Sequence, residues 1–205
     1  MTKCPIQRRF LTTLMSNLQL TTDILQNGAE AIGVELDQNQ LSQFVEFYET
    51  MLDWNTRANL TSITKWEEVL VKHFLDSLTV SLGTPNGIKA GCLVDVGSGA
   101  GFPGIPLKIA FPFLTTTLVE ATGKKTAFLH HVKESLCIDL NILTGRAETL
   151  AHKAEFRGGF DFVVSRAVAS ISVLAELCLP FCKTGGTMIA QKKGEIESEI
   201  YSAQN

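Results

Sequence analysis

Hydrophobic residues in the first part of the chain recur at helical spacing. Residues 41–54 (LSQFVEFYETMLDW) and residues 66–78 (WEEVLVKHFLDSL) each place most of their apolar side chains on one face of a helix. Such a face has to pack against another element. We therefore expect residues 24–82 to form a helical subdomain, preceded by an N-terminal extension of residues 1–23.

A different pattern follows the turn-rich stretch of residues 83–91, GTPNGIKAG. Short apolar runs typical of buried strands now alternate with helical segments, which predicts an α/β domain over residues 83–205 with a parallel sheet covered on both faces. Its ligand is expected beyond the carboxyl ends of the strands, beside the first one. The expected strands are 92–96, 115–121, 140–145, 161–168 and 186–193, and the expected helices are 104–111, 124–137 and 171–181.

Composition narrows the class of protein. The 205 residues are 45% hydrophobic and 19% charged, which is typical of a globular chain with a real core. Five cysteines stand singly without zinc-like spacing, so we expect reduced thiols in a cytoplasmic protein and no metal site. No stretch of the sequence is apolar for long enough to span a bilayer, so we expect no membrane insertion, and we expect a monomer. The basic, Ser/Thr-rich N-terminus also has the composition of an organelle-targeting peptide.

The glycine-rich stretch VDVGSGAGFPG, residues 94–104, is the strongest candidate for a ligand site. Gly99, Gly101 and Gly104 fit the dinucleotide pattern G-x-G-x-x-G, whereas Ile105 stands where a triphosphate-binding loop needs lysine. A glycine turn without a ligand is disfavoured, because glycines forgo side-chain packing and carry an entropy cost.

Asp95 favours a cationic ligand at this loop. Its carboxylate would repel a pyrophosphate, but it would attract the ammonium and sulfonium groups of S-adenosylmethionine. In that frame Gly97, Gly99 and Gly101 make room for the methyl donor, and Glu120 holds the ribose hydroxyls. The chain after Glu120 is also short for a dehydrogenase, although an NAD-binding oxidoreductase remains the alternative.

The residues after the fourth expected strand indicate the methyl acceptor. SRAVAS, residues 165–170, is not the Asn-Pro-Pro turn of exocyclic amine methylation, and Cys178 lies in an apolar helix, where a thiolate nucleophile is not expected. An acceptor that is already nucleophilic, such as N7 of guanine, needs no general base. Two histidine features stay open: we expect one of His130 and His131 to face the sheet, and His73 and Asp76 to share a helix face.

Basic residues follow the expected strands on the ligand side of the sheet. Arginines there are suited to a carboxylate, an RNA phosphate or a guanine edge, and lysines to phosphates. This makes them candidates for RNA contact: Lys124, Lys125, Arg146, Arg166, Lys192 and Lys193.

Several motifs in a fixed order resemble one family. LDWNTRANLTSIT, VKHFLDSL, LVDVGSGAGFPGIPLKIAFP, LVEATGKKTAFL, GRAETL, FDFVVSRAVASI and QKKG are similar to the bacterial 16S ribosomal RNA (guanine-N7) methyltransferases, the glucose-inhibited division protein B family. The resemblance runs from residue 24 to residue 194. It implies a class I (Rossmann-like) S-adenosylmethionine-dependent methyltransferase that acts on a guanine in the decoding-region loop, on 16S ribosomal RNA or the small ribosomal subunit.

The resemblance also implies roles for individual residues. Gly97 and Phe102 are expected to contact the donor, and Glu120 to hold its ribose. Ala147 and Glu148 of GRAE are expected beside the adenine, and Arg166 of SRA at donor and acceptor together. Asn59, His73 and Asp76 lie in family motifs without an assigned role.

The end of the sequence differs from the family pattern. Relatives continue after the fifth strand into a helix–strand–strand unit that completes their sheet, so we expect the C-terminal strands to be missing here. This leaves a second hypothesis beside the enzyme, namely a protein that binds S-adenosylmethionine without catalysis.

Overall fold

The computed structural model describes residues 15–84, 87–88, 90–166, 169–194 and 196–203. Its centre is a five-stranded parallel sheet in the order β3-β2-β1-β4-β5. The strands are β1 (Gly91–Val96), β2 (Leu114–Glu120), β3 (Leu140–Thr144), β4 (Phe160–Arg166) and β5 (Cys182–Gln191). All five expected strands are therefore confirmed, although β5 begins four residues before its expected start, and Ala167 and Val168 lie outside the described residues.

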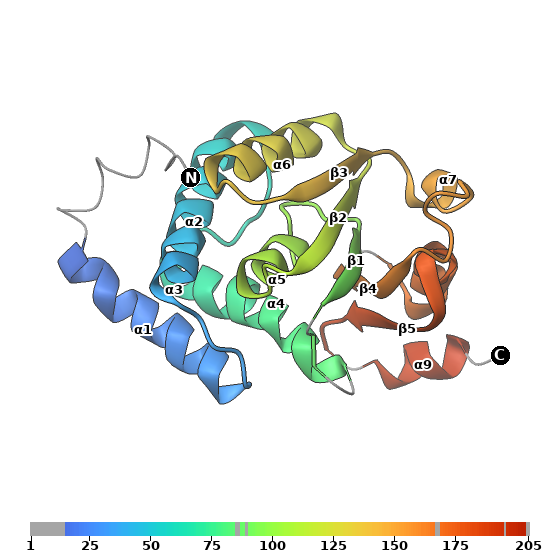
Figure 1. Ribbon diagram of the computed structural model, residues 1–205, viewed down its shortest axis with the longest axis horizontal. Coiled ribbons are helices and arrows are strands. Elements are labelled where there is room, and N and C mark those ends of the chain that lie inside the picture. Colours follow the sequence, from blue (N-terminus) through green and yellow to red (C-terminus); the bar gives the residue numbers. More distant parts are fainter. Residues whose placement is uncertain (1–14, 85–86, 89, 167–168, 195, 204–205) are drawn as a thin grey trace.

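Helices cover both faces of the sheet (Figure 1). On one face lie α5 (Gly104–Ala110) and α6 (Gly123–Ser135), and on the other α7 (Ala147–Leu150) and α8 (Ile171–Cys178), which continues as the 3₁₀ turn Leu179–Phe181. The short helices α7 and α9 (Glu197–Ala203) had no counterpart in the expected elements. The parallel sheet with helices on both faces confirms the α/β architecture expected from the sequence.

The first part of the chain is helical, as expected. It contains α1 (Met15–Ala31), α2 (Gln38–Ala58), α3 (Trp66–Val69), the π-helix η2 (Leu70–Leu75), α4 (Asp76–Leu78) and the 3₁₀ helix η3 (Thr79–Gly83). Helix α1 begins before residue 24, so it crosses the expected boundary between extension and subdomain. Asp37 starts α2 with a capping box, in which its side chain accepts the Gln40 N–H and the Gln40 side chain accepts the Asp37 N–H.

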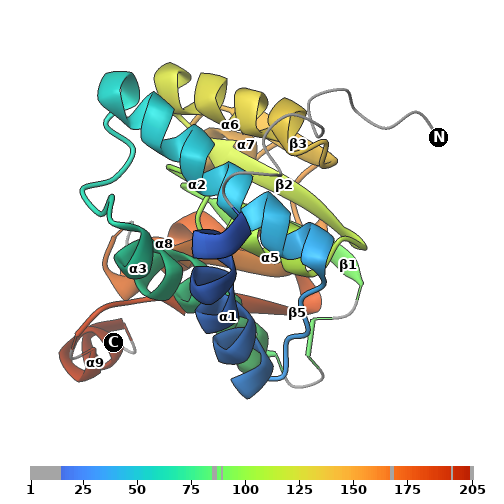
Figure 2. The same cartoon turned by 90° about the vertical axis from the view of Figure 1, so that its left-hand side faces the viewer.

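These helices share one hydrophobic core with the sheet. Phe44 and Phe47 of α2 and Phe74 of η2 are fully buried, and they belong to the same cluster as Phe102 and Phe128 of the α/β part. The rings of Phe47 and Phe102 lie 5.2 Å apart. Figure 2 shows α2 lying beside α6 on the sheet. The apolar face predicted for residues 41–54 is thus buried against the face of the sheet that carries α5 and α6.

The orientation of α6 corrects one expectation. Its buried side chains include Phe128, Leu129 and Val132, whereas His130 and His131 are both exposed. The expectation that one of these histidines faces the sheet is wrong, because the preceding Phe128 and Leu129 already occupy the sheet-facing positions. Within the described residues, no helix has the length and apolar character to cross a membrane.

Candidate functional site

The glycine loop after β1 is held against the end of β2 by backbone hydrogen bonds. The N–H groups of Gly97 and Ser98 both donate to the Val119 carbonyl, at 2.9 and 3.0 Å. The Gly99 N–H donates to Glu120 Oε2 at 2.9 Å. Gly97, Gly99 and Gly101 all have positive φ angles, a conformation that side chains with a Cβ rarely adopt. The loop is therefore built before any ligand arrives.

A pocket of about 480 Å³ opens above this loop, at the carboxyl ends of the strands. Its size is within the range of small-molecule sites. Nine of the residues expected at the site line it: Gly97, Gly99, Phe102, Glu120, Lys125, Arg146, Ala147, Glu148 and Arg166. The pocket thus brings together the loop after β1, the ends of β2 and β4, and the start of α7, as the topological rule for parallel sheets requires.

Asp95 does not lie in the pocket. It is fully buried beneath the loop, where its Oδ2 accepts the Gly104 N–H at 2.9 Å and its backbone carbonyl accepts the Ser98 hydroxyl. Burial raises the pKa of its carboxyl group to about 7. The expectation that this carboxylate faces a cationic ligand is not supported, because its contacts hold the loop itself.

Gly101 also differs from the expected role. It is absent from the described pocket lining, and a Cβ at this position would overlap the Ile105 side chain and lie 3.2 Å from Leu129 Cδ2. Gly101 therefore makes room for the packing of α5 and α6. Gly99, in contrast, lines the pocket, and a Cβ there would meet only the Gly97 carbonyl, at 3.9 Å.

The lysines expected to bind RNA lie in different settings. Lys125 lines the pocket, and Lys124 and Lys193 are exposed outside it. The ammonium group of Lys192 instead contacts Glu199 at 2.9 Å and donates to the Ala169 carbonyl at 2.6 Å, and its side chain is only 14% exposed. Since its charge is used within the protein, Lys192 is not presented to an RNA phosphate.

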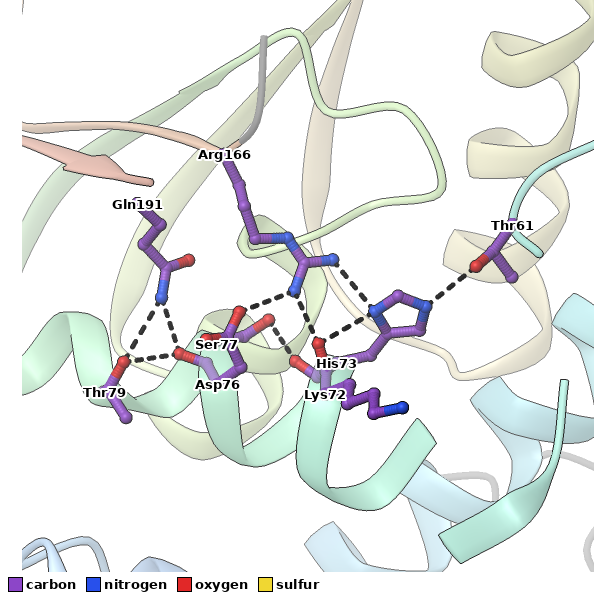
Figure 3. Close-up of polar contacts among 8 residues, drawn as sticks. All are labelled: Thr61, Lys72, His73, Asp76, Ser77, Thr79, Arg166 and Gln191. Atoms are coloured by element: carbon purple, nitrogen blue, oxygen red, sulfur yellow. Dashed lines mark hydrogen bonds and ion pairs between the residues drawn. The ribbon is translucent and has the colours of Figure 1, made fainter. Parts of the chain in front are cut away.

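His73 and Arg166 line a second part of the pocket, away from Ala147 and Glu148, and they belong to a polar network around Arg166 (Figure 3). Arg166 Nη1 donates to Asp76 Oδ2 at 3.0 Å, and Nη2 lies 3.3 Å from His73 Nδ1. The guanidinium carbon is 4.8 Å from the ring centre of Phe102. His73 and Asp76 share a face of their helical segment, as expected, because both contact Arg166, which is 90 residues from Asp76 in the sequence.

Sequence reasoning did not assign several pocket residues. Leu60 and Thr61 come from the connection between α2 and α3, His73 from η2 and Leu177 from α8. The motifs NLT and HFLDS contain three of them, but their place at the pocket depends on how the N-terminal helices pack. In the described part of the chain, no cluster of three or more His, Cys, Asp or Glu side chains is arranged to hold a metal ion.

Comparison with known proteins identifies the family that this chain matches. The family model described as rRNA small subunit methyltransferase G (GidB) matches residues 40–205. A ribosomal RNA small subunit methyltransferase G of Alkaliphilus metalliredigens is 45% identical over 183 residues, covering 89% of this chain and 76% of the relative. Its counterpart in Lachnoclostridium phytofermentans is 48% identical over 179 residues, covering 86% and 73%. Among solved structures, a Corynebacterium glutamicum protein superposes with a TM-score of 0.52 at 13% identity, covering 89% of this chain and 84% of that one.

Proposed function

Because the chain belongs to the rRNA small subunit methyltransferase G family, we propose that it methylates N7 of a guanine in the decoding-region loop of 16S ribosomal RNA. Methyl transfer with S-adenosylmethionine as cofactor is the chemistry of this fold and family. An NAD-dependent oxidoreductase, which the G-x-G-x-x-G pattern allowed, is not consistent with that membership. The proposal adds two points to family membership: the methylated atom is N7, and the guanine lies in the decoding-region loop.

The residues of the pocket fit a nucleoside methyl donor. Both oxygens of Glu120 are directed to the loop end of the pocket, since Oε2 accepts the Gly99 N–H and Oε1 accepts the Thr122 N–H at 2.7 Å. Each oxygen keeps lone-pair capacity for a ribose hydroxyl. Ala147 and Glu148 line the same pocket at the start of α7, where we place the adenine. The cofactor supplies a methyl group on a sulfonium, which any sufficiently nucleophilic lone pair can take.

The observation that carries the choice of N7 is the lack of a base among the described pocket residues. The carboxylates in the pocket lining are Glu120 and Glu148, both at the nucleoside end. His73 has one ring nitrogen 2.9 Å from the Thr61 hydroxyl and the other 3.3 Å from Arg166. An acceptor that had to lose a proton first would find no partner there, whereas N7 of guanine has a lone pair ready for in-line attack.

Carbon methylation through a thiolate is not compatible with Cys178. This cysteine is fully buried in α8, and burial raises the pKa of its thiol to about 12. It hence stays protonated and inaccessible at neutral pH. Arg166 is the residue that we propose to touch the acceptor, because it is the guanidinium that lines the pocket beside Phe102, and an arginine N–H can donate to O6 of guanine, next to N7.

The experiment that tests the proposal supplies methyl-labelled S-adenosylmethionine with small ribosomal subunits, or with naked 16S ribosomal RNA, from a strain that lacks the modification. Digestion to nucleosides and chromatography should place the label in 7-methylguanosine. Arg166→Ala should abolish transfer while calorimetry still detects binding of the donor.

Two results would contradict the proposal. Label in another nucleoside would move the acceptor away from N7. Donor binding without any label would favour the non-catalytic binding protein.

A further inference from the structure

His73 occupies the centre of the network opposite the nucleoside end. It lies in the π-helix η2, and π-helical turns often occur at functional sites. Its ring stacks on Phe102 with 4.5 Å between ring centres and 22° between planes, and the residue is only 8% exposed. One ring nitrogen contacts Thr61 and the other contacts Arg166, so His73 joins two segments that are far apart in sequence (Figure 3).

The proton on the imidazole can be assigned from its partners. Nδ1 lies 3.3 Å from Arg166 Nη2 and 3.1 Å from the Lys72 carbonyl oxygen. A guanidinium only donates hydrogen bonds, so a proton on Nδ1 would leave Nη2 without its acceptor, whereas the Lys72 carbonyl already accepts from Arg166 Nη1 at 3.3 Å. We therefore place the proton on Nε2, which donates to the Thr61 hydroxyl oxygen at 2.9 Å. Burial and the Arg166 charge lower the pKa of His73 to about 4, which keeps the ring neutral at physiological pH.

The position of Thr61 is restrained because the Asn55 side chain forms hydrogen bonds with its backbone. The Asn55 side chain accepts the N–H groups of Leu60 and Thr61, at 2.7 and 3.0 Å, and donates to the Thr61 carbonyl at 2.9 Å. Asn59 ends α2 in the left-handed conformation, with φ 48°, which turns the chain toward the pocket. Through Thr61 this well-braced segment orients the imidazole.

Arg166 is restrained from its other side by the helix that carries His73. Its Nη1 donates to Asp76 Oδ2 and to the Lys72 carbonyl, at 3.0 and 3.3 Å. The Asp76 carbonyl in turn accepts the Gln191 side-chain N–H at 2.6 Å. Three of the N–H directions of the guanidinium are therefore committed to the protein, one of them to His73.

We infer that His73 is a positioning residue for methyl transfer, which holds the guanidinium of Arg166 so that it cannot bind N7 of the acceptor guanine. The inference rests on the function proposed above. An unrestrained arginine prefers to contact O6 and N7 of guanine together, as a two-pronged fork. That contact would occupy the lone pair that has to attack the methyl group. With both N–H groups of Nη1 held by Asp76 and the Lys72 carbonyl, and one N–H of Nη2 directed at His73, two of the five N–H groups remain for the acceptor. The fixed orientation of the guanidinium directs these two, in our inference, to O6 and away from N7.

The test compares His73→Asn with His73→Gln. The Asn amide oxygen can take the place of Nδ1 and still accept from Arg166, whereas the Gln amide reaches the Nε2 position and keeps only the Thr61 contact. We expect His73→Gln to lower kcat on the order of 10- to 100-fold, the effect of a small misplacement of a positioned group. His73→Asn should retain most of kcat, and neither should change KM for S-adenosylmethionine. His130→Gln, the same change at an exposed histidine of α6, is the matched control.

Thr61→Val gives an independent measurement, because it leaves His73 in place and removes the hydroxyl that orients it, which also accepts the Ile63 N–H at 3.1 Å. We expect a lower kcat with unchanged donor affinity. This variant decides the question if neither His73 variant folds.

Three outcomes would overturn the inference: His73→Gln or Thr61→Val with wild-type kcat, equal losses in His73→Asn and His73→Gln, or losses that follow a drop in donor affinity and thermal stability. These results are distinct from a failure of the proposed function, in which the wild-type protein itself leaves N7 of guanine unlabelled. In that case the inference falls with it.

Discussion

The carboxyl group of Asp95 is buried in the middle of the protein, between the glycine loop and β1. One oxygen accepts the Gly104 N–H, and the other has no partner among the described residues. Desolvation raises its pKa from 3.8 to about 7, assisted by the charge of Glu120 and opposed by Gly104 N–H and Arg166. Because its charged form is the costly one, this residue couples the stability of the loop to pH.

Replacing Asp95 by Asn should flatten the dependence of stability on pH. Between pH 3.8 and about 7 the folded protein holds a proton on Asp95 that the unfolded chain has released, so stability falls as pH rises through this window. Urea unfolding at about pH 5 and about pH 7.5 should show a larger loss for the wild type than for D95N. Equal losses would mean that Asp95 is ionised in the folded protein throughout.

Gly101 should be intolerant of even one added carbon atom. A Cβ would come within 2.8 Å of Ile105 Cγ1, at a φ angle of +84° that disfavours any side chain. Gly101→Ala should lose about 1–2 kcal/mol from the backbone conformation and about 1–3 kcal/mol more from overpacking, measured by urea unfolding.

Gly33→Ala is the control for this prediction. Gly33 has a similar φ of +77° but no atom within 4 Å of the added carbon, so only the backbone part of the loss is expected. Equal losses at both positions would show that the Ile105 side chain moves aside at little cost.

At the scale of elements, two glutamines attach α2 to the helices α5 and α6 that cover the sheet. Gln40 Nε2 donates to the carbonyls of Ile109 and Ala110 at the end of α5, at 2.8 and 3.1 Å. Gln43 Nε2 donates to the Leu136 carbonyl at the end of α6, at 3.1 Å. Carbonyls at helix ends lack partners within the helix, and these side chains supply them.

Removing the Gln40 amide should loosen the contact between α2 and α5. Gln40→Met keeps the apolar length of the side chain, leaves two partly buried carbonyls without their donor and removes the acceptor of the Asp37 N–H in the capping box, for an expected loss of about 1–3 kcal/mol in chemical unfolding. Ser42→Ala, which removes only an exposed hydroxyl bonded within α2, should change stability by no more than about 0.5 kcal/mol. A loss in Gln40→Met as small as that would show that water replaces the amide.

Hydrophobic spacing predicted most elements, because the strands and α2, α6 and α8 owe their position to burial. It failed where burial does not decide the structure. Helix α7 has four residues, too few for a helical period to show, and β5 begins in the polar run KTGG, whose pairing with β4 depends on the partner strand. The π-helical turn at His73 likewise has no signature in spacing, since its apolar residues also fit an α-helix.

Only part of the pocket could be predicted, because only some of its residues are placed by the order of strands and helices. Glu120 and the glycines follow strand ends, and the parallel topology alone brings such positions together. Arg166 and Asp76 meet only because the N-terminal helices pack on the sheet, through contacts that no local pattern encodes. Asp95 was placed at the correct strand end but on the wrong side of the loop, because the direction of a side chain at a strand end depends on the loop that covers it.

At the scale of the whole molecule, a net charge of −3 coexists with basic side chains around the pocket mouth. Lys124 and Lys125 begin α6 at the carboxyl end of the sheet. Lys183 lies at the other end, near the start of β5, and pairs with Asp161 at 2.9 Å. The distribution of basic residues, more than the total, therefore decides where a polyanion can bind.

Salt dependence of RNA binding should locate that surface. The variant Lys124→Ala/Lys125→Ala should weaken binding of 16S ribosomal RNA and reduce the slope of log affinity against log salt by about 1 for each phosphate that the protein no longer neutralises. Lys183→Ala should leave the slope unchanged, with filter binding at several salt concentrations as the measurement. The reverse pattern would place the RNA at the amino ends of the strands.

The position of Glu120 has a consequence for turnover. With this carboxylate on the ribose, as proposed above, the loop end of the pocket recognises the nucleoside part of the donor. That part is not altered by methyl transfer. S-adenosylhomocysteine, the spent donor, keeps the same ribose and adenine and loses only a methyl group and its charge. Asp95, the carboxylate that would respond to that charge, faces away from the pocket. The spent donor should therefore compete effectively with the fresh one, and sustained methylation in a cell would depend on another enzyme that removes the product.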